Sequence, residues 1–218
     1  FSIHGIEEQL FIESHILSIA DPDLVLSDSR DTYHLFPASF PARFRQSAQA
    51  IDWLEANIRQ FDLVVIHGFW NFLCIRSAYV AARQQVRYVV WPHGSLDPFD
   101  LQKKKQIKKL IGPLVGKPVL RRAEQVCFTA GQESLIVETY GAPIRRKVLP
   151  LPIDSVRYPA SADESFRTTY GIEPDEFVFL FLSRINYKKR LDTIIEAMHR
   201  LHTGGRRVRL VVAGYDKS

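Results

Sequence analysis

Short apolar runs, separated by segments with the spacing of amphipathic helices, constrain the fold of this 218-residue chain more than any other feature. The runs lie at residues 62–66, 88–91, 125–128, 147–149, 177–182 and 208–214. Strands that are apolar along their whole length are buried on both faces, and helices between them supply the crossover connections of a parallel sheet. The sequence therefore predicts an α/β fold built from parallel sheets.

A proline-rich stretch at residues 150–163 divides this series of runs into two parts. It contains Pro150, Pro152 and Pro159 among small and polar residues, which is typical of an interdomain linker. We therefore expect a first domain over residues 1–153 and a second over residues 154–218, of which only the beginning is present. Because the chain starts without methionine and stops directly after the last apolar run, we expect a fragment of a longer protein.

The segments that follow the apolar runs contain the candidate site residues, because ligands of open α/β sheets bind beyond the carboxyl ends of the strands. These segments are His67-Gly68-Phe69-Trp70 after the run at 62–66, Pro92-His93-Gly94-Ser95 after the run at 88–91, and Ser183-Arg184 after the run at 177–182. Two histidines and one arginine thus stand at predicted strand ends. We expect this edge to bind the ligand.

Each of these side chains has two interpretations. A histidine at a strand end either acts in catalysis or serves as a structural hydrogen-bond donor. His93 is the better catalytic candidate than His67, because Gly94 lets the backbone approach a ligand closely and an imidazole can donate to a sugar hydroxyl or a phosphate oxygen near neutral pH. Phe69 and Trp70 form either an apolar wall against a sugar or lipid, or part of the core.

Two cations stand near the predicted start of a helix in the second domain. Arg184 follows the run at 177–182, and Lys189 precedes a helical stripe of apolar residues. The stripe consists of Leu191, Ile194, Ile195, Met198 and Leu201. The amino end of a helix has free N–H groups and about half a positive charge, so it can join Arg184 and Lys189 in neutralising a diphosphate without a metal ion. The alternative is a solvated charge run beside a buried strand.

The net charge of +5 is concentrated in one segment, Lys103–Arg122, which has eight basic residues and no acidic one. The basic residues are Lys103, Lys104, Lys105, Lys108, Lys109, Lys117, Arg121 and Arg122. Ile107, Leu110, Ile111 and Leu114 recur at helical spacing within it. The segment is therefore either a surface helix packed through this stripe, or a peripheral contact with an anionic membrane or acceptor. Nucleic acid is disfavoured because no aromatic residues interleave the lysines.

Several classes of function lack their usual sequence marks. No apolar stretch approaches the roughly 18 residues of a membrane span and no signal peptide is visible, so we expect a cytoplasmic protein. Cys74 and Cys127 make neither a disulfide framework nor a zinc pair. Asp21-Pro22-Asp23 is interpreted as a polar turn, and no metal is expected. The phosphate-binding glycine-rich loop, the dinucleotide fingerprint and the serine nucleophile elbow are absent.

Taken together, these segments resemble glycosyltransferase family 4 over residues 62–214. The most specific segment is FLSRINYKKRLDTIIEA at residues 181–197, which is similar to the donor-binding segment of that family. DLVVIHGFW at 62–70 is similar to a strand and loop on the acceptor side, and WPHGS at 91–95 is similar to the loop whose histidine approaches the donor sugar.

The resemblance implies a GT-B fold with two Rossmann-like domains and a hexosyltransferase-type activity. It assigns the nucleotide diphosphate to Arg184 and Lys189, with Ser183 and Gly94 also on the donor. It assigns the catalytic role to His93 and places His67, Phe69 and Trp70 on the acceptor side. A sugar would pass from a UDP- or GDP-sugar to a lipid-linked or saccharide hydroxyl with retained configuration and without a metal, in exopolysaccharide, lipopolysaccharide or capsule synthesis at the inner face of the plasma membrane.

The chain departs from the family pattern at three places. Ser183 and Arg190 stand where glycine is usual, residues 151–154 lack the usual Asn-Gly turn, and the paired-glutamate motif is not reached. Two alternatives therefore remain open. One is a non-catalytic subunit that binds a nucleotide sugar or serves as a scaffold; the other is a GT-B nucleotide-sugar epimerase, which would need acid and base carboxylates in its site.

Overall fold

The computed structural model describes residues 15–19, 32–39, 46–103, 105–151 and 165–215. The chain divides into two compact units, Phe1–Asp154 and Ser155–Ser218, which are treated separately below. The linker at 152–163 and Asp21-Pro22-Asp23 lie outside the described residues.

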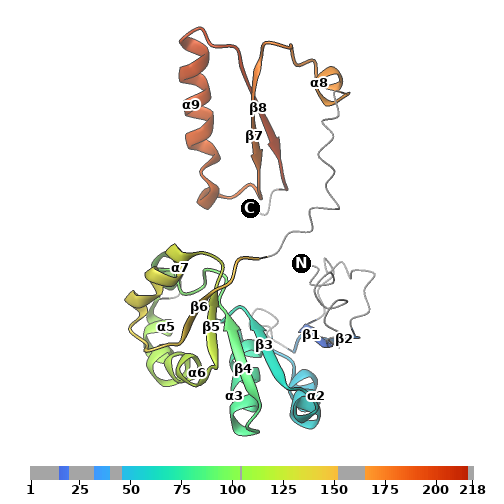
Figure 1. The fold of residues 1–218 in the computed structure, drawn as a ribbon, viewed down its shortest axis with the longest axis vertical. Coiled ribbons are helices and arrows are strands. Elements are labelled where there is room, and N and C mark those ends of the chain that lie inside the picture. Colours follow the sequence, from blue (N-terminus) through green and yellow to red (C-terminus); the bar gives the residue numbers. More distant parts are fainter. Residues whose placement is uncertain (1–14, 20–31, 40–45, 104, 152–164, 216–218) are drawn as a thin grey trace. The chain divides into compact units, whose positions relative to one another are not determined.

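The first unit is centred on a four-stranded parallel sheet, as the apolar runs predicted (Figure 1). Its strands, in spatial order, are β3 (Leu63–His67), β4 (Arg87–Trp91), β5 (Gln125–Phe128) and β6 (Arg146–Val148). A separate parallel pair, β1 (His15–Ile19) with β2 (Thr32–Phe36), precedes it and was not predicted.

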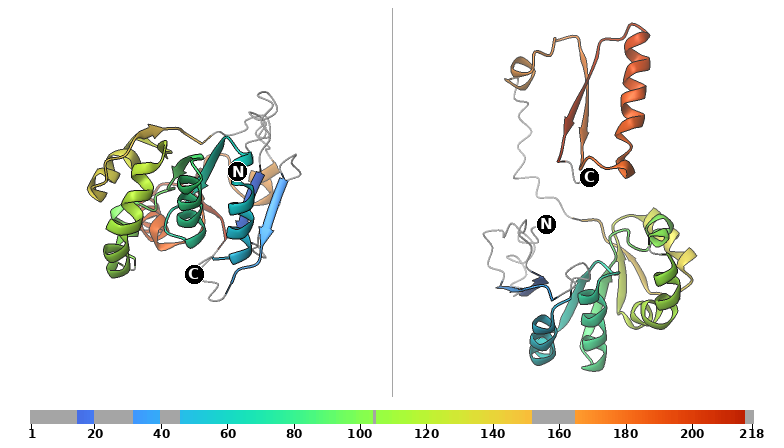
Figure 2. Two further views of the ribbon diagram at one scale, coloured as in Figure 1. Left: turned by 90° about the horizontal axis from the view of Figure 1, so that it is seen from below. Right: turned by 180° about the vertical axis from the view of Figure 1, so that it is seen from behind.

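Helices connect the strands of the first unit. They are α2 (Ala48–Asn57), α3 (Phe72–Arg83), α4 (Pro98–Gln102), α5 (Lys105–Ile111), α6 (Lys117–Arg122) and α7 (Gly131–Ile136). Short 3-10 turns follow α2 at Ile58–Gln60 and α7 at Val137–Tyr140, and a π-helical turn, η3 (Gly112–Gly116), joins α5 to α6. Helix α3 packs along β3 and β4 and also contacts α2 and α6 (Figures 1 and 2). The buried core forms where these helices meet the central strands, around Val90, Val126 and Phe128.

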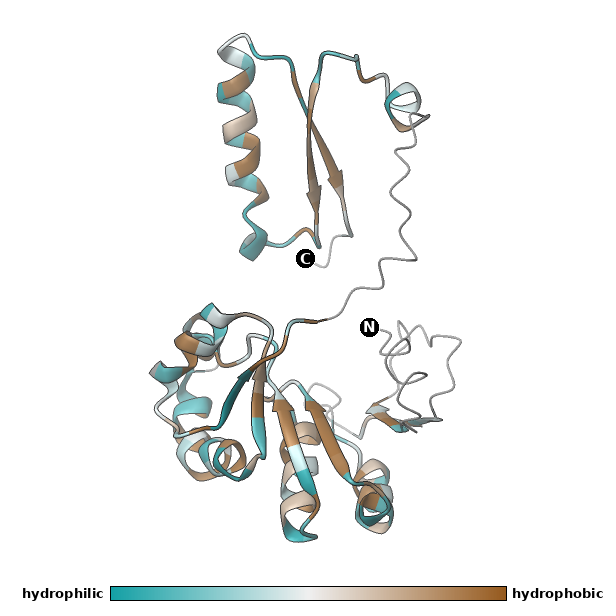
Figure 3. Ribbon diagram, viewed as in Figure 1, coloured by the Kyte–Doolittle hydropathy of each residue, from teal (hydrophilic) through white to brown (hydrophobic). Residues whose placement is uncertain are grey.

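The second unit contains the parallel strands β7 (Phe177–Leu182) and β8 (Val208–Ala213), paired in register from Phe177 opposite Val208. Helix α8 (Ser165–Thr169) precedes β7, and α9 (Leu191–Thr203) connects the two strands. Figure 3 shows both strands in the brown of apolar residues along most of their length. The apolar stripe of α9 was expected to be buried, but its members are half-buried or exposed, because the described part of this unit offers the helix only two strands.

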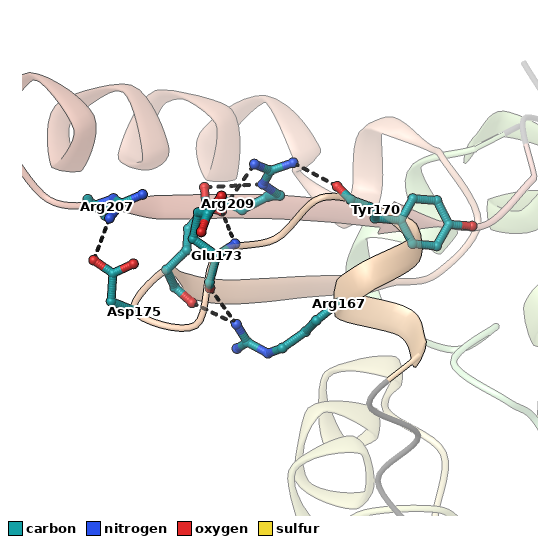
Figure 4. A network of polar contacts seen from close by, with 7 residues as sticks. Arg167, Tyr170, Glu173, Asp175, Arg207 and Arg209 are labelled. Carbon is teal, nitrogen blue, oxygen red and sulfur yellow. Dashed lines mark hydrogen bonds and ion pairs between the residues drawn. The ribbon is translucent and has the colours of Figure 1, made fainter.

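A network of arginines fixes the amino ends of β7 and β8 and the end of α8 (Figure 4). Arg209 makes a two-point contact with the carboxylate of Glu176, with nitrogen–oxygen distances of 3.1 and 3.0 Å, and donates to the carbonyl of Tyr170 at 3.2 Å. Arg207 pairs with Asp175 at 2.5 Å. These contacts hold the ends of the strands opposite the candidate ligand edge.

At the carboxyl edge of the second unit, Gly214 approaches the backbone of Ser183 very closely. A Cβ atom at Gly214 would lie 1.8 Å from the carbonyl oxygen of Ser183, a distance that no side chain tolerates. The close approach continues the pairing of β7 with β8, since the Ser183 N–H donates to the Ala213 carbonyl at 3.1 Å. Glycine at position 214 therefore sets where Ser183 and Arg184 lie.

We expect Gly214→Ala to lower the free energy of unfolding of the second unit by more than about 2 kcal/mol, because the clash is with backbone that cannot rotate away. Protection of the β7 and β8 amides from hydrogen exchange measures this effect within the unit. Gly204→Ala is the matched control, since its φ of −80° suits any residue and its Cβ would meet the nearest oxygen at 3.3 Å. Equal protection in the two variants would contradict the expected clash.

Candidate functional site

The pairing of β3 with β4 brings the two candidate histidines together. His67 is the last residue of β3 and is in register with Trp91, the last residue of β4, while His93 follows two residues later. The Gly68 N–H donates to the Trp91 carbonyl at 2.8 Å, which extends the parallel pairing into the loops. Both imidazoles therefore lie at the carboxyl edge of the sheet, as the sequence predicted.

The two imidazoles are in direct contact. His67 Nδ1 and His93 Nε2 are 2.8 Å apart, and the ring centroids are 5.1 Å apart with nearly parallel planes. Trp91 stacks with both rings, at 5.6 Å from His67 and 5.9 Å from His93. In a neutral pair, one nitrogen of the contact donates and the other accepts. Either arrangement leaves His67 Nε2 and His93 Nδ1 as one donor and one acceptor for a ligand.

Both histidines favour the neutral form. Burial against the neighbouring rings lowers the pKa of His67, and the nearby charge of His93 lowers it further. Burial also lowers the pKa of His93, while the negative charge of Glu133 opposes this and raises it. The pair is therefore suited to exchange hydrogen bonds with a hydroxyl or a phosphate oxygen near neutral pH.

The loop that holds His93 has a strained backbone. His93 has φ of +50° and Gly94 has φ of +74°, so a non-glycine residue stands in the left-handed region. Such residues persist only where the surroundings fix them, and they gather at functional sites.

The carboxylate of Glu133, in the first turn of α7, fixes this loop. Its Oε1 accepts from the Gly94 N–H at 2.6 Å, and its Oε2 accepts from the Thr129 N–H at 3.0 Å and the Thr129 hydroxyl at 2.9 Å. One carboxylate thus ties the loop after β4 to the end of β5. The sequence analysis did not single out Glu133, although an acidic residue in the first turn of a helix after a strand-end threonine is a signal for such a contact.

The aromatic residues after β3 have different surroundings. Phe69 has an exposed fraction of only 2% and belongs to the core, where it supports Trp70 edge to face at 4.9 Å. Trp70 is half-buried, and its Nε1 donates to the Ser95 carbonyl at 3.0 Å. Lys108 lies over the Trp70 ring, 5.4 Å from its centroid. Trp70 therefore connects the loops after β3 and β4 through its hydrogen bond to Ser95, and the buried Phe69 packs against its ring.

The second group of candidate residues lies at the end of β7. Ser183 follows the strand, Arg184 is exposed, and Lys189 is exposed in the 3-10 turn η6 (Tyr187–Lys189). Within the part of the chain that the structure describes, no carboxylate pairs with the side chain of Arg184 or Lys189. Two cations in one unit are thus available to an anionic ligand.

The amino end of α9 is already partly neutralised. Arg190, the residue before the helix, has φ of +52°, and its guanidinium makes a two-point contact with Asp192 at 3.0 Å. The hydrogen bond from Arg190 is the largest cause of the lowered pKa of the Asp192 carboxyl. Anion binding here therefore depends more on Arg184 and Lys189 than on the helix end.

Other features of the described residues lie elsewhere. A hollow of about 320 Å³ in the first unit is lined by Val137, Glu138, Gly141, Ala142, Pro143, Ile144 and Arg146, none of which is a predicted site residue. Glu138 and Arg146 pair with each other there at 2.5 Å.

The described residues include no cluster of three or more metal-ligating side chains. No described helix combines the length and the apolar character that crossing a membrane requires.

Two family models match the sequence. The glycosyl transferase 4-like domain matches residues 20–152, and the glycosyl transferases group 1 domain matches residues 162–218. The chain belongs to this glycosyltransferase family. Among curated proteins, no sequence matches it.

Several solved structures align with most of this chain. Sucrose-phosphate synthase from Thermosynechococcus elongatus aligns with a TM-score of 0.64 at 16% identity, over 92% of this chain and 52% of that one. The S. aureus MnaA–UDP co-structure aligns at 0.45 with 14% identity, over 91% and 61%. UDP-N-acetylglucosamine 2-epimerase from Rickettsia bellii aligns at 0.39 with 13% identity, over 94% and 70%. The chain spans 52% and 61% of the first two proteins.

The predicted α/β fold of the GT-B type is confirmed by the parallel sheets and by the match to sucrose-phosphate synthase. The predicted family is confirmed by the two domain models. The roles of individual site residues stay predictions.

We expect Glu133→Gln to lower the free energy of unfolding of the first unit by about 1–2 kcal/mol. The amide oxygen can still accept a hydrogen bond, but the amide nitrogen cannot, and the negative charge is lost. Urea unfolding followed by tryptophan fluorescence reports on this unit, which contains Trp53, Trp70 and Trp91. Glu138→Gln is the matched control, since it removes an exposed ion pair whose contribution is about 0–1 kcal/mol. A larger loss of unfolding free energy in Glu138→Gln than in Glu133→Gln would contradict the stabilising role of the Glu133 contacts.

The histidine pair makes the first unit less stable in acid. Because the pKa values of His67 and His93 lie below their ordinary 6.5 in the folded state, the unfolded chain binds more protons as the pH falls through 6.5. The free energy of unfolding should therefore fall in that window, and His67→Gln should flatten the dependence. NMR titration should give midpoints below 6.5 for both imidazoles, with His93 lowered further in Glu133→Gln; an unchanged His93 midpoint would contradict the role of that charge.

Proposed function

We propose that this glycosyltransferase chain serves the transfer of a sugar from a nucleoside diphosphate sugar to a hydroxyl acceptor, with retention of the anomeric configuration. The observation that carries the proposal is the presence of two exposed cations in the segment after β7, Arg184 and Lys189 of η6, with which no described carboxylate pairs. They belong to the segment that matches the glycosyl transferases group 1 domain.

The physical requirement of the reaction is stabilisation of the leaving group. As the bond between the anomeric carbon and the phosphate oxygen breaks, negative charge grows on the diphosphate. In this proposal Arg184 and Lys189 lie beside the diphosphate, and their positive charges lower the barrier by stabilising the charge that grows on it. Guanidinium and ammonium groups supply the charge that a metal ion supplies in other transferases, so we infer metal-independent transfer.

The residues of the first unit serve the sugar and the acceptor in this proposal. His93, held in a left-handed conformation by Glu133, orients the donor sugar, with the Gly94 backbone beside it. His67 and Trp70 face the acceptor, while the buried Phe69 supports them from the core. No described carboxylate stands out as a covalent nucleophile, so we infer attack on the same face as the leaving group, whose phosphate takes the acceptor proton.

The pathway follows from the resemblance to family 4. We infer a UDP- or GDP-sugar as the donor, a lipid-linked or saccharide hydroxyl as the acceptor, and a role in exopolysaccharide, lipopolysaccharide or capsule synthesis in the cytoplasm.

The test is a metal-free thermal shift with UDP, GDP and ADP. One nucleotide at 100 times its dissociation constant should add about 2.7 kcal/mol to the free energy of unfolding. Arg184→Ala and Lys189→Ala should each weaken its binding about tenfold or more, because each removes a charge-assisted contact to phosphate. Arg200→Gln, which removes an exposed cation of α9 that pairs with Glu196, should bind as the wild type does.

Nucleotide release separates the possible activities. Release from a donor sugar only when an acceptor is present identifies a transferase. Interconversion of nucleotide sugars without an acceptor identifies an epimerase, and tight binding without either reaction identifies a binding subunit. Absence of stabilisation by all three nucleotides would contradict the proposed diphosphate site.

A further inference from the structure

The helical segment from α5 to α6 has two apolar faces, of which the fold uses only one. Ile107 and Leu110 of α5 and Leu114 of η3 have exposed fractions of 55%, 71% and 77%. They recur at intervals of three and four residues and so lie along one side of the helix. Such a stripe normally packs against the protein core, but here it faces solvent.

The other face of the segment shows that this orientation is set by packing. A Cβ at Gly116 would lie 2.5 Å from the Tyr140 hydroxyl and 3.2 Å from the Trp70 ring, and one at Gly112 would lie 3.2 Å from the same hydroxyl. Both glycines are buried, and Val119 and Leu120 of α6 continue this inner face. Rotating the helix to bury Leu110 and Leu114 would drive larger side chains into this close contact. The leucine stripe is therefore fixed outward.

Four exposed cations belong to the same helical segment as the outward stripe. Lys105 and Lys109 of α5 and Arg121 and Arg122 of α6 are exposed, and the sequence between residues 103 and 122 has no acidic residue. Two further lysines are used within the protein, since Lys108 contacts Trp70 and Lys103 pairs with Asp100 at 3.1 Å. The segment thus combines an outward apolar stripe with four exposed positive charges.

We propose that this segment, with Ile107, Leu110 and Leu114 on its outward face and four exposed cations along its length, docks on the surface of an anionic lipid bilayer. A helix with an apolar stripe and flanking cations lies in the membrane interface, where the stripe enters the acyl boundary and the cations meet anionic headgroups. Each lysine or arginine near such a surface contributes about 1 kcal/mol.

Charge complementarity favours the bilayer over other occupants. Two copies of this chain would bring eight cations together without an acidic residue from this segment to offset them. A nucleic acid would pair with the cations but would leave the leucines in water. The inference goes beyond the proposed sugar transfer and does not depend on it, because membrane binding is measured without donor or acceptor.

The test is co-sedimentation of the chain with vesicles of phosphatidylcholine alone and of phosphatidylcholine mixed with phosphatidylglycerol. We expect binding to the mixed vesicles that weakens as salt is added, because salt screens the headgroup charge. Leu110→Ser with Leu114→Ser should reduce binding by about tenfold or more, since both side chains leave the acyl boundary. Lys105→Gln and Lys109→Gln should each reduce it about fivefold.

Matched controls lie in the same unit. Leu135→Ser changes a leucine of α7 with an exposed fraction of 59%, and Arg59→Gln removes an exposed cation after α2. Both should bind mixed vesicles as the wild type does. Because the changed leucines are exposed, the thermal midpoint of the double variant should match that of the wild type and so exclude loss of the fold.

The proposal is overturned if the chain does not bind mixed vesicles, if it binds neutral and mixed vesicles equally, or if the double leucine variant binds as the wild type does. It is also overturned if the leucine changes abolish self-association and leave vesicle binding intact, which would assign the surface to a second copy. Loss of membrane binding with unchanged nucleotide binding would confirm that the two sites are separate.

Discussion

The hydrogen bonds of one carboxylate hold the candidate site of the first unit in place. Glu133 accepts from the backbone of Gly94 and from Thr129, and it thereby joins the loop after β4 to the end of β5. This contact helps to offset the strain of the left-handed conformation of His93, which is of order 1–3 kcal/mol, together with the hydrogen bond from Trp70 to the Ser95 carbonyl. The contact between the two imidazoles depends on it in turn, because His67 is fixed by its strand and only His93 comes from a loop. Glu133 on α7 thus helps to hold the loop of His93 through the Gly94 N–H, and its charge opposes the lowering of the His93 pKa by burial.

The presence of six strands and their parallel arrangement were predictable, because continuous apolar runs separated by helical patterns are typical of parallel sheets. Strands β5 and β7 begin and end where the sequence predicted, and His67 and His93 lie at one edge because neighbouring parallel strands end together. Their direct contact was not predictable, since it depends on the left-handed turn at His93 and on a side chain 40 residues away in the chain.

The limits of periodicity are clearest in the helices. The stripe of α9 has the spacing of a buried face, yet spacing does not tell how many strands stand opposite to cover it. The stripe of α5 has the same spacing and faces outward, because the opposite face of the segment packs closely against Tyr140 and Trp70 through Gly112 and Gly116. A one-dimensional pattern identifies an apolar face, and only the three-dimensional neighbours decide whether that face is buried. Phe69 illustrates the opposite case, since a residue of a strand-end loop is part of the core.

Arg190 shows how a departure from the family pattern can leave the charge of the site unchanged. The family usually has glycine at this position, and the left-handed φ of +52° explains why, since only glycine adopts it without strain. The guanidinium of Arg190 makes a two-point contact with Asp192, so its positive charge is paired with a carboxylate in the first turn of α9. The charge that remains available to an anion therefore comes from Arg184 and Lys189.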